Sequence, residues 1–154
     1  MSQLTTFRLV SVRTGAGLFL ATLALATSSC GNGRKNCYPV AGTIHVDGKP
    51  VADAMIQLHS ADPADHEGPN RVIPLAMTDE TGKFKLSTYG DNDGAPVGEY
   101  AVTITWRQRS GLLKNQFDGP DRLKGKYNSK ELSVLKVTIE KKPQELTPFE
   151  LTTK

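Results

Sequence analysis

The sequence predicts an all-β domain, an antiparallel β-sandwich, that follows an N-terminal export signal. Apolar and polar residues alternate with a period of two in several short segments, while helical periodicity is almost absent. Turn-forming Gly, Pro and Asp residues separate these segments, as they do in sandwiches of short strands. An apolar run near the N-terminus ends in small residues and a cysteine, which is typical of an exported protein.

The first element is the apolar run within "GLFLATLALATSSCGNG" (17–33). Arg8 and Arg13 precede it with no acidic residue upstream, and the residues from Gly15 to Ala26 are almost all apolar. This is the layout of a secretory signal, and the run is shorter than the roughly 20 apolar residues that span a bilayer. We therefore expect residues 1–29 to be a signal peptide rather than a transmembrane anchor.

Two cleavage sites remain open. Cleavage after "ALA" (24–26) would release a water-soluble protein. Cys30 instead follows two serines, the small-small-Cys end of a lipoprotein signal, although Thr27 stands where such signals usually carry Leu. Lipidation of Cys30 is the favoured interpretation, with residues 30–37 as a glycine-rich flexible tether. It predicts an exported protein, anchored to a membrane through its lipid and facing the periplasm or the cell surface.

Composition adds two constraints on the mature chain. Cys30 and Cys37 are the two cysteines, and a thioether at Cys30 excludes a disulfide between them, so we expect Cys37 to be unpaired or bridged to another chain. The net charge of +3 falls to +1 once Arg8 and Arg13 leave with the signal peptide. A nearly neutral chain gives no argument for nucleic-acid binding, and its length fits one domain, residues 38–154.

Each strand expected in this domain has one apolar face. "YPVAGTIHV" (38–46) alternates from its Val40 onward, and "EYAVTITWR" (99–107) shows the strongest alternation. One apolar face per strand is typical of an antiparallel sheet that covers a core on one side. The residues expected to face the core are Val40, Ile44, Val46, Ala54, Ile56, Leu58, Phe84, Leu86, Tyr100, Val102, Ile104, Trp106, Leu135, Val137, Ile139, Phe149 and Leu151.

Turn residues mark the ends of these strands. Asp47-Gly48 predicts a tight hairpin, because glycine accepts a positive φ without a Cβ clash. "DETG" (79–82) serves similarly before Phe84. Pro74 cannot donate a ladder hydrogen bond, so "VIPLAM" (72–77) is expected at a sheet edge.

Three stretches resemble the carboxypeptidase regulatory-like, or transthyretin-like, family. They are "GTIHVDGKPVADAMIQLH" (42–59), "TDETGKFKLSTY" (78–89) and "DGAPVGEYAVTITW" (93–106). The later "LKGKY" and "ELTPFEL" resemble the C-terminal half of small bacterial lipoproteins that carry this domain. The resemblance covers nearly all of the mature chain. It implies a seven-stranded antiparallel sandwich of transthyretin, or prealbumin, type, usually without catalytic activity of its own.

Enzymatic relatives of that fold use residues that this sequence does not match. It lacks the Tyr-Arg-Gly-Ser of hydroxyisourate hydrolases, and His45, His59 and His66 do not form the Tyr-and-His iron set of intradiol dioxygenases. The alternation turns His45 and His59 away from the core. No nucleophile elbow, phosphate-binding loop or HExxH motif occurs. The expected function is a non-catalytic binding or structural module at the cell envelope; the alternative is a small hydrolase of transthyretin type.

No metal or other cofactor is expected. "GDNDGAPVGE" (90–99) resembles the start of a calcium loop at Asp91 and Asp93, but Tyr89 and Tyr100 stand where an EF-hand needs acidic ligands. Asp and Asn also stabilise turns by bonding their own backbone, so a turn is favoured.

The segment 107–131 is the candidate contact for a partner. It carries seven basic residues against three acidic ones and shows no clear alternation. Long loops on rigid scaffolds often bind ligands, here an anionic envelope polymer, a lipid headgroup or a protein. The favoured alternative is a surface connection whose apolar residues, Tyr127 among them, fold back over a sandwich edge. The candidate binding residues are Arg109, Arg122, Lys124 and Lys126.

Overall fold

The computed structural model describes residues 33–65, 71–108 and 119–154, all within the compact unit Asn32–Lys154. Cys30, Arg109, His66 and the predicted signal peptide lie outside the described residues. The described secondary structure is β-strand, apart from one turn of 3-10 helix, η1 (Pro63–Asp65), so the all-β prediction is confirmed. In this part of the chain, no helix has the length and apolar character needed to cross a membrane.

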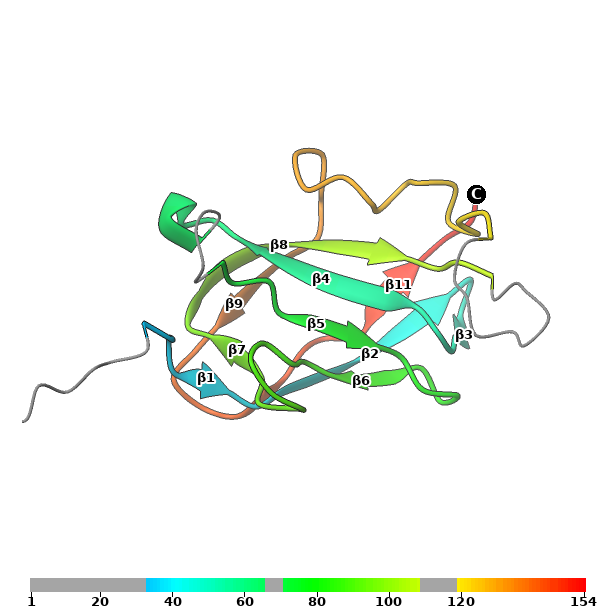
Figure 1. Cartoon of the computed structure of the whole chain (residues 1–154). Coiled ribbons are helices and arrows are strands. Elements are labelled where there is room, and N and C mark those ends of the chain that lie inside the picture. Colours follow the sequence, from blue (N-terminus) through cyan, green and yellow to red (C-terminus); the bar gives the residue numbers. More distant parts are fainter. Residues whose placement is uncertain (1–32, 66–70, 109–118) are drawn as a thin grey trace, which may run out of the picture. The chain divides into compact units, whose positions relative to one another are not determined.

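The first sheet is built around β2 (Val40–Val46), which runs through its centre (Figure 1). β3 (Lys49–Pro50) and β6 (Lys83–Lys85) pair with β2 antiparallel, whereas β10 (Gln144–Glu145) and β11 (Phe149–Leu151) pair with it parallel. The prediction of a purely antiparallel sandwich is therefore wrong. Alternation reports which face of a strand is buried, and it is the same whether the neighbouring strand runs parallel or antiparallel.

The second sheet is antiparallel throughout, in the order β5-β4-β8-β9. Its strands are β5 (Leu75–Met77), β4 (Met55–Ser60), β8 (Gly98–Thr105) and β9 (Lys136–Ile139). β5 lies at the edge, which confirms the interpretation drawn from Pro74.

A separate antiparallel pair, β1 (Cys37–Tyr38) with β7 (Ala95–Pro96), lies where the chain enters β2 and β8. The described residues thus form eleven strands, four of them only two residues long. The seven-stranded transthyretin arrangement stays a prediction.

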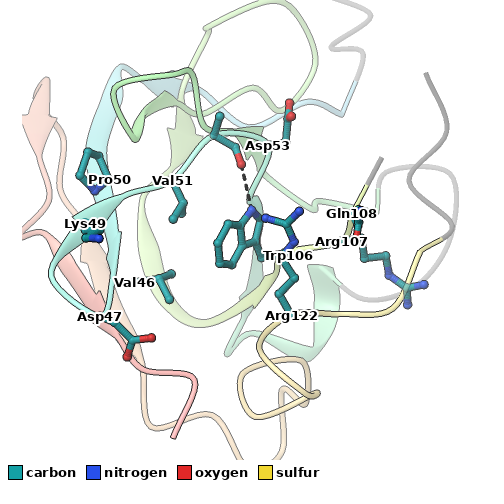
Figure 2. Close-up of a pocket in the computed structure, with 11 residues that line it drawn as sticks. Val46, Asp47, Lys49, Pro50, Val51, Asp53, Trp106, Arg107, Gln108 and Arg122 are labelled. Carbon is teal, nitrogen blue, oxygen red and sulfur yellow. Dashed lines mark hydrogen bonds between the residues drawn. The ribbon is translucent and has the colours of Figure 1, made fainter. Parts of the chain in front are cut away.

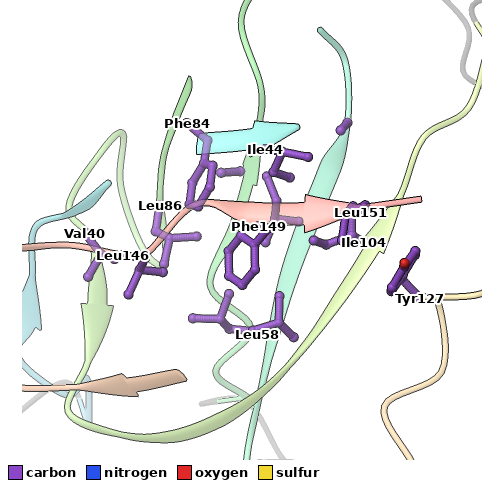
Figure 3. Packing of buried hydrophobic residues seen from close by; sticks show 14 of the residues in the cluster. Val40, Ile44, Leu58, Phe84, Leu86, Ile104, Tyr127, Leu146, Phe149 and Leu151 are labelled. Atoms are coloured by element: carbon purple, nitrogen blue, oxygen red, sulfur yellow. The ribbon is translucent and has the colours of Figure 1, made fainter. Parts of the chain in front are cut away.

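Side chains from the two sheets share one core (Figure 3). Ile44 of β2 and Ile56 and Leu58 of β4 are fully buried. The rings of Phe84 and Phe149 stack with 6.2 Å between their centroids. Two layers that bury their inner faces against one another give the arrangement of a β-sandwich.

The predicted core is confirmed for most of its residues, with three at its margin. Trp106, Leu135 and Val137 are partly buried and pack against the cluster. The placement of Trp106 inside the core is therefore wrong. β8 ends at Thr105, so Trp106 lies one residue beyond the strand, at the rim of the two layers.

The predicted hairpin turn follows β2. Asp47 and Gly48 have φ values of 50° and 77°, the positive values that a two-residue type I′ turn requires. The turn aligns His45 and Val46 with Pro50 and Lys49 of β3. It thereby fixes one side of the pocket described next.

Candidate ligand-binding site

An open pocket of about 730 Å³ lies where the β2–β3 hairpin meets the residues that follow β8 (Figure 2). Val46 and Val51 supply apolar lining from the hairpin side. Trp106, Arg107 and Arg122 supply an indole ring and two guanidinium groups from the other side. The pocket thus combines an apolar surface with cationic groups, the combination found in many ligand sites.

Trp106 is held in place by two hydrogen bonds. Its indole Nε1 donates to the carbonyl oxygen of Ala52 at 3.0 Å, the dashed line in Figure 2. Its backbone amide donates to Oδ1 of Asp121 at 2.9 Å. The first bond ties the ring to the segment that leads into β4, and the second ties it to residues 119–128. The indole therefore has a fixed orientation although it is only partly buried.

Asp121 organises the segment that carries the predicted binding residues. Its Oδ1 also accepts a hydrogen bond from the amide of Leu123 at 3.1 Å, and its Oδ2 accepts one from the amide of Gly125 at 3.0 Å. Leu123 and Tyr127 are buried in the core cluster, so the segment is attached through both its backbone and its apolar side chains. This is the folded-back arrangement weighed against partner binding above.

The same turn places Arg122 against the indole. The Arg122 amide donates to the Trp106 carbonyl oxygen at 2.8 Å, and the guanidinium carbon lies 4.6 Å from the centre of the indole ring. Figure 2 shows the Arg122 side chain lying beside that ring. A guanidinium group over an aromatic face is stabilised by a cation–π contact and keeps N–H groups at its edge as donors.

Charges of both signs line the pocket. Lys49, Arg107 and Arg122 are cationic, and Asp47 and Asp53 are acidic. Asp47 accepts a hydrogen bond of 2.7 Å from the Thr153 hydroxyl, and this bond is the main reason that its pKa lies below its usual value. Within the described residues, neither arginine forms an ion pair with a carboxylate. Their donors suit the paired oxygens of a carboxylate or phosphate.

The structure separates the predicted binding residues. Arg122 lines the pocket, but Lys124 and Lys126 direct their amino groups to residues that follow β11. Lys124 Nζ donates to the Thr153 carbonyl oxygen at 3.2 Å, and Lys126 Nζ donates to that of Lys154 at 3.0 Å. Arg109 lies outside the described residues. Sequence reasoning did not associate Trp106 with this site, and it missed Asp121 and Arg107. The spacing of an aspartate four residues before a glycine, "DRLKG", was the available signal for the Asp121 turn.

The described histidines lie on outer sheet faces, as the alternation predicted. His45 Nδ1 lies 2.6 Å from Oε1 of Glu150, its register partner on β11. His59 Nε2 lies 2.9 Å from the Thr103 hydroxyl on β8. A pocket with converging His, Arg or Asp residues would favour the hydrolase alternative. The pocket brings arginines and aspartates together, so it meets this criterion through those two residue types, although neither described histidine lines it. The hydrolase therefore stays an alternative.

The aspartates of the predicted turns bind backbone amides. Asp93 accepts hydrogen bonds from the amides of Thr88, Tyr89 and Gly90 at 2.7 to 3.0 Å. Asp79 likewise accepts bonds in the "DETG" turn. These contacts support the turn interpretation of both segments. In the described ranges no three His, Cys, Asp or Glu residues group as a metal site would require.

Comparisons with known proteins give no family. No family model and no curated protein matches the chain. Among solved structures, a crystal structure of a DUF3823 family protein from Parabacteroides merdae is similar with a TM-score of 0.36 and 12% identity. The similarity covers 77% of this chain and 46% of that one, so the chain spans less than half the length of that protein. At this TM-score the similarity carries no argument about fold or function.

Proposed function

We propose that this chain is an exported, non-catalytic β-sandwich of carboxypeptidase regulatory-like type, anchored to a membrane by a lipid on Cys30. It acts as a binding module at the cell envelope. Its ligand is an anionic polymer whose carboxylate or phosphate groups bind in the pocket beside Trp106. The transthyretin-type hydrolase is the competing function.

One observation carries the binding function: the Arg122 guanidinium is fixed against the Trp106 indole at a pocket mouth. Asp121 bonds both the Trp106 amide and the turn that holds Arg122, so the cation is positioned before any ligand arrives. A preorganised cation loses little conformational entropy on binding, which favours affinity. Arg107 and Lys49 add positive charge at the same opening.

The anchoring half of the proposal has a direct test. The full chain is expressed in a bacterium that processes lipoproteins, together with Cys30→Ser and the matched control Cys37→Ser. Intact-mass analysis and detergent phase partition are expected to show a lipid on the native chain and on Cys37→Ser, but not on Cys30→Ser. A water-soluble native product that begins at Thr27 would refute the anchor.

The binding half is tested with Arg122→Glu and the matched control Lys126→Glu, because both are exposed cations of one turn and only Arg122 lines the pocket. Polyanions with carboxylate or phosphate groups serve as probes. Binding is expected to weaken as salt rises, since exposed charges are screened within about 10 Å at 0.1 M ionic strength. Arg122→Glu is expected to abolish binding and Lys126→Glu to reduce it slightly. Equal losses would reject the pocket as the site.

A further inference from the structure

The residues that follow β11 contact both sides of the Trp106 pocket. One side is the β2–β3 hairpin, which contributes Asp47 and Lys49 to the lining. The other side is the Asp121 turn, which contributes Arg122. Figure 1 shows the end of the chain beside the segment that carries this turn. The chain that leaves β11 can therefore connect the two sides of the pocket.

Thr153 binds the hairpin side through Asp47. Its hydroxyl donates a hydrogen bond to Oδ2 of Asp47 at 2.7 Å, and its backbone amide donates one to Oδ1 at 3.3 Å. The Asp47 amide donates in turn to the Leu151 carbonyl oxygen at 2.9 Å. Hydrogen bonds to an ionised carboxylate are stronger than those between neutral groups. The tip of the hairpin is therefore attached to the residues after β11.

The same residues bind the other side of the pocket. The Thr153 carbonyl oxygen accepts a hydrogen bond of 3.2 Å from Lys124 Nζ, and Lys124 lies two residues after Arg122. The Thr152 amide donates to the hydroxyl of Tyr127 at 3.2 Å, and Tyr127 belongs to the buried core cluster. Thr153 thus joins the hairpin tip to the turn that holds Arg122, and it uses different atoms for each side.

A second connection between the two sides lies at Trp106, whose indole donates to the Ala52 carbonyl oxygen (Figure 2). One connection alone would let the hairpin and the turn pivot about it. Connections at two separate points fix the spacing between them. A pocket whose sides are fixed before the ligand arrives loses less conformational entropy on binding, which favours affinity.

We propose that Thr153 is a positioning residue of the Trp106 pocket, which holds the hairpin side and the Arg122 side at the spacing that an anionic ligand requires. This inference rests on the proposed binding function. Thr153 is not one of the residues that line the pocket, so it acts through Asp47 and Lys124 and does not touch the ligand.

The test compares three variants of the full chain. Thr153→Val removes the hydroxyl but nearly keeps the shape of the side chain, and Thr153→Ser keeps the hydroxyl. The matched control is Thr81→Val, because the Thr81 hydroxyl also donates a 2.7 Å bond to an aspartate, Asp79, in a turn that does not line this pocket. Binding of polyphosphate and of polyglutamate is measured by isothermal titration calorimetry, and stability by urea unfolding.

Thr153→Val is expected to weaken binding about five-fold, whereas Thr153→Ser and Thr81→Val should stay within about two-fold of the native affinity. Thr153→Val and Thr81→Val remove similar bonds, so both should lower the free energy of unfolding, and only the affinity should distinguish them. In an Asp47→Ala background, Thr153→Val should not weaken binding further, because the acceptor of the hydroxyl bond is already gone.

Four results would overturn the inference. An unchanged affinity of Thr153→Val, or an equal loss of affinity in Thr81→Val, would leave the pocket as the binding site and remove the positioning role. A loss of affinity in Thr153→Ser as large as in Thr153→Val would show that the hydroxyl is not responsible. A further loss in the Asp47→Ala background would show that the effect does not pass through Asp47. If the native chain binds neither polymer, the proposed function itself fails, and this inference fails with it.

Discussion

Replacing Trp106 tests how the candidate pocket is held together. A fully buried Trp→Ala change costs about 3–5 kcal/mol, and because Trp106 is only partly buried we expect roughly 2 kcal/mol from packing. Loss of the 3.0 Å bond to Ala52 adds about 1 kcal/mol. Loss of the Arg122 contact adds about 0.5 kcal/mol. Trp106→Ala is therefore expected to lower the free energy of unfolding by about 3–4 kcal/mol.

The conservative variant separates these contributions. Trp106→Phe keeps most of the apolar contact and an aromatic face, but it removes the hydrogen bond, so we expect a loss of about 1–1.5 kcal/mol. Both free energies come from urea unfolding followed by far-UV circular dichroism, since Trp106 is the only tryptophan. Adding Arg122→Ala to each background measures the cation–π term, which should be present with Phe and absent with Ala. Equal losses for Phe and Ala, or a loss below about 1 kcal/mol for Ala, would refute this account of the site.

Three further predictions concern the framework. Gly42→Ala would place a Cβ 2.5 Å from the ring of buried Phe84. We therefore expect the free energy of unfolding, measured in urea, to fall by about 1–3 kcal/mol, and by less in a Phe84→Leu background. Tyr100→Phe removes a 2.9 Å hydrogen bond to a backbone carbonyl and should lower the free energy of unfolding by about 1 kcal/mol in the same assay. An unchanged free energy of unfolding would contradict this bond. The Thr81 hydroxyl is the main cause that lowers the pKa of Asp79, so Thr81→Val should raise that pKa toward 3.8 in an NMR titration. A lowered carboxyl pKa stabilises the fold only while the group is ionised. The loss of stability caused by Thr81→Val should therefore disappear as the pH falls through the pKa of Asp79. A loss of stability that does not change with pH would contradict the role given to the Thr81 hydroxyl.

Strand faces and turns could be predicted because they depend on neighbours in sequence. The alternation from Val40 to Val46 matches the burial of β2, and Asp47-Gly48 forms the expected turn. Strand pairing could not be predicted in this way. β11 pairs with β2 across about a hundred residues, as the separation of 105 between His45 and Glu150 shows, and no local pattern encodes the direction of so distant a neighbour.

The candidate site was predicted only in part, for a similar reason. Arg122 was singled out from local charge, and it does line the pocket. The roles of Lys124 and Lys126 depend on C-terminal carbonyl groups that lie 29 and 28 residues away in sequence. The apolar alternation includes Trp106 and therefore predicted that it lies in the core. Its backbone amide instead donates a hydrogen bond to Asp121, in the segment that follows β8 along the chain.

The candidate pocket and the described N-terminal residues lie at opposite ends of β2. β1 and the N-terminal segment lie at the start of β2, whereas Asp47 and Lys49 follow its end (Figure 1). The seven residues of β2 span roughly 20 Å at about 3.3 Å per residue. The Trp106 pocket therefore opens at the opposite end of the central strand from the described N-terminal residues, so a ligand of Arg122 can enter without contacting them.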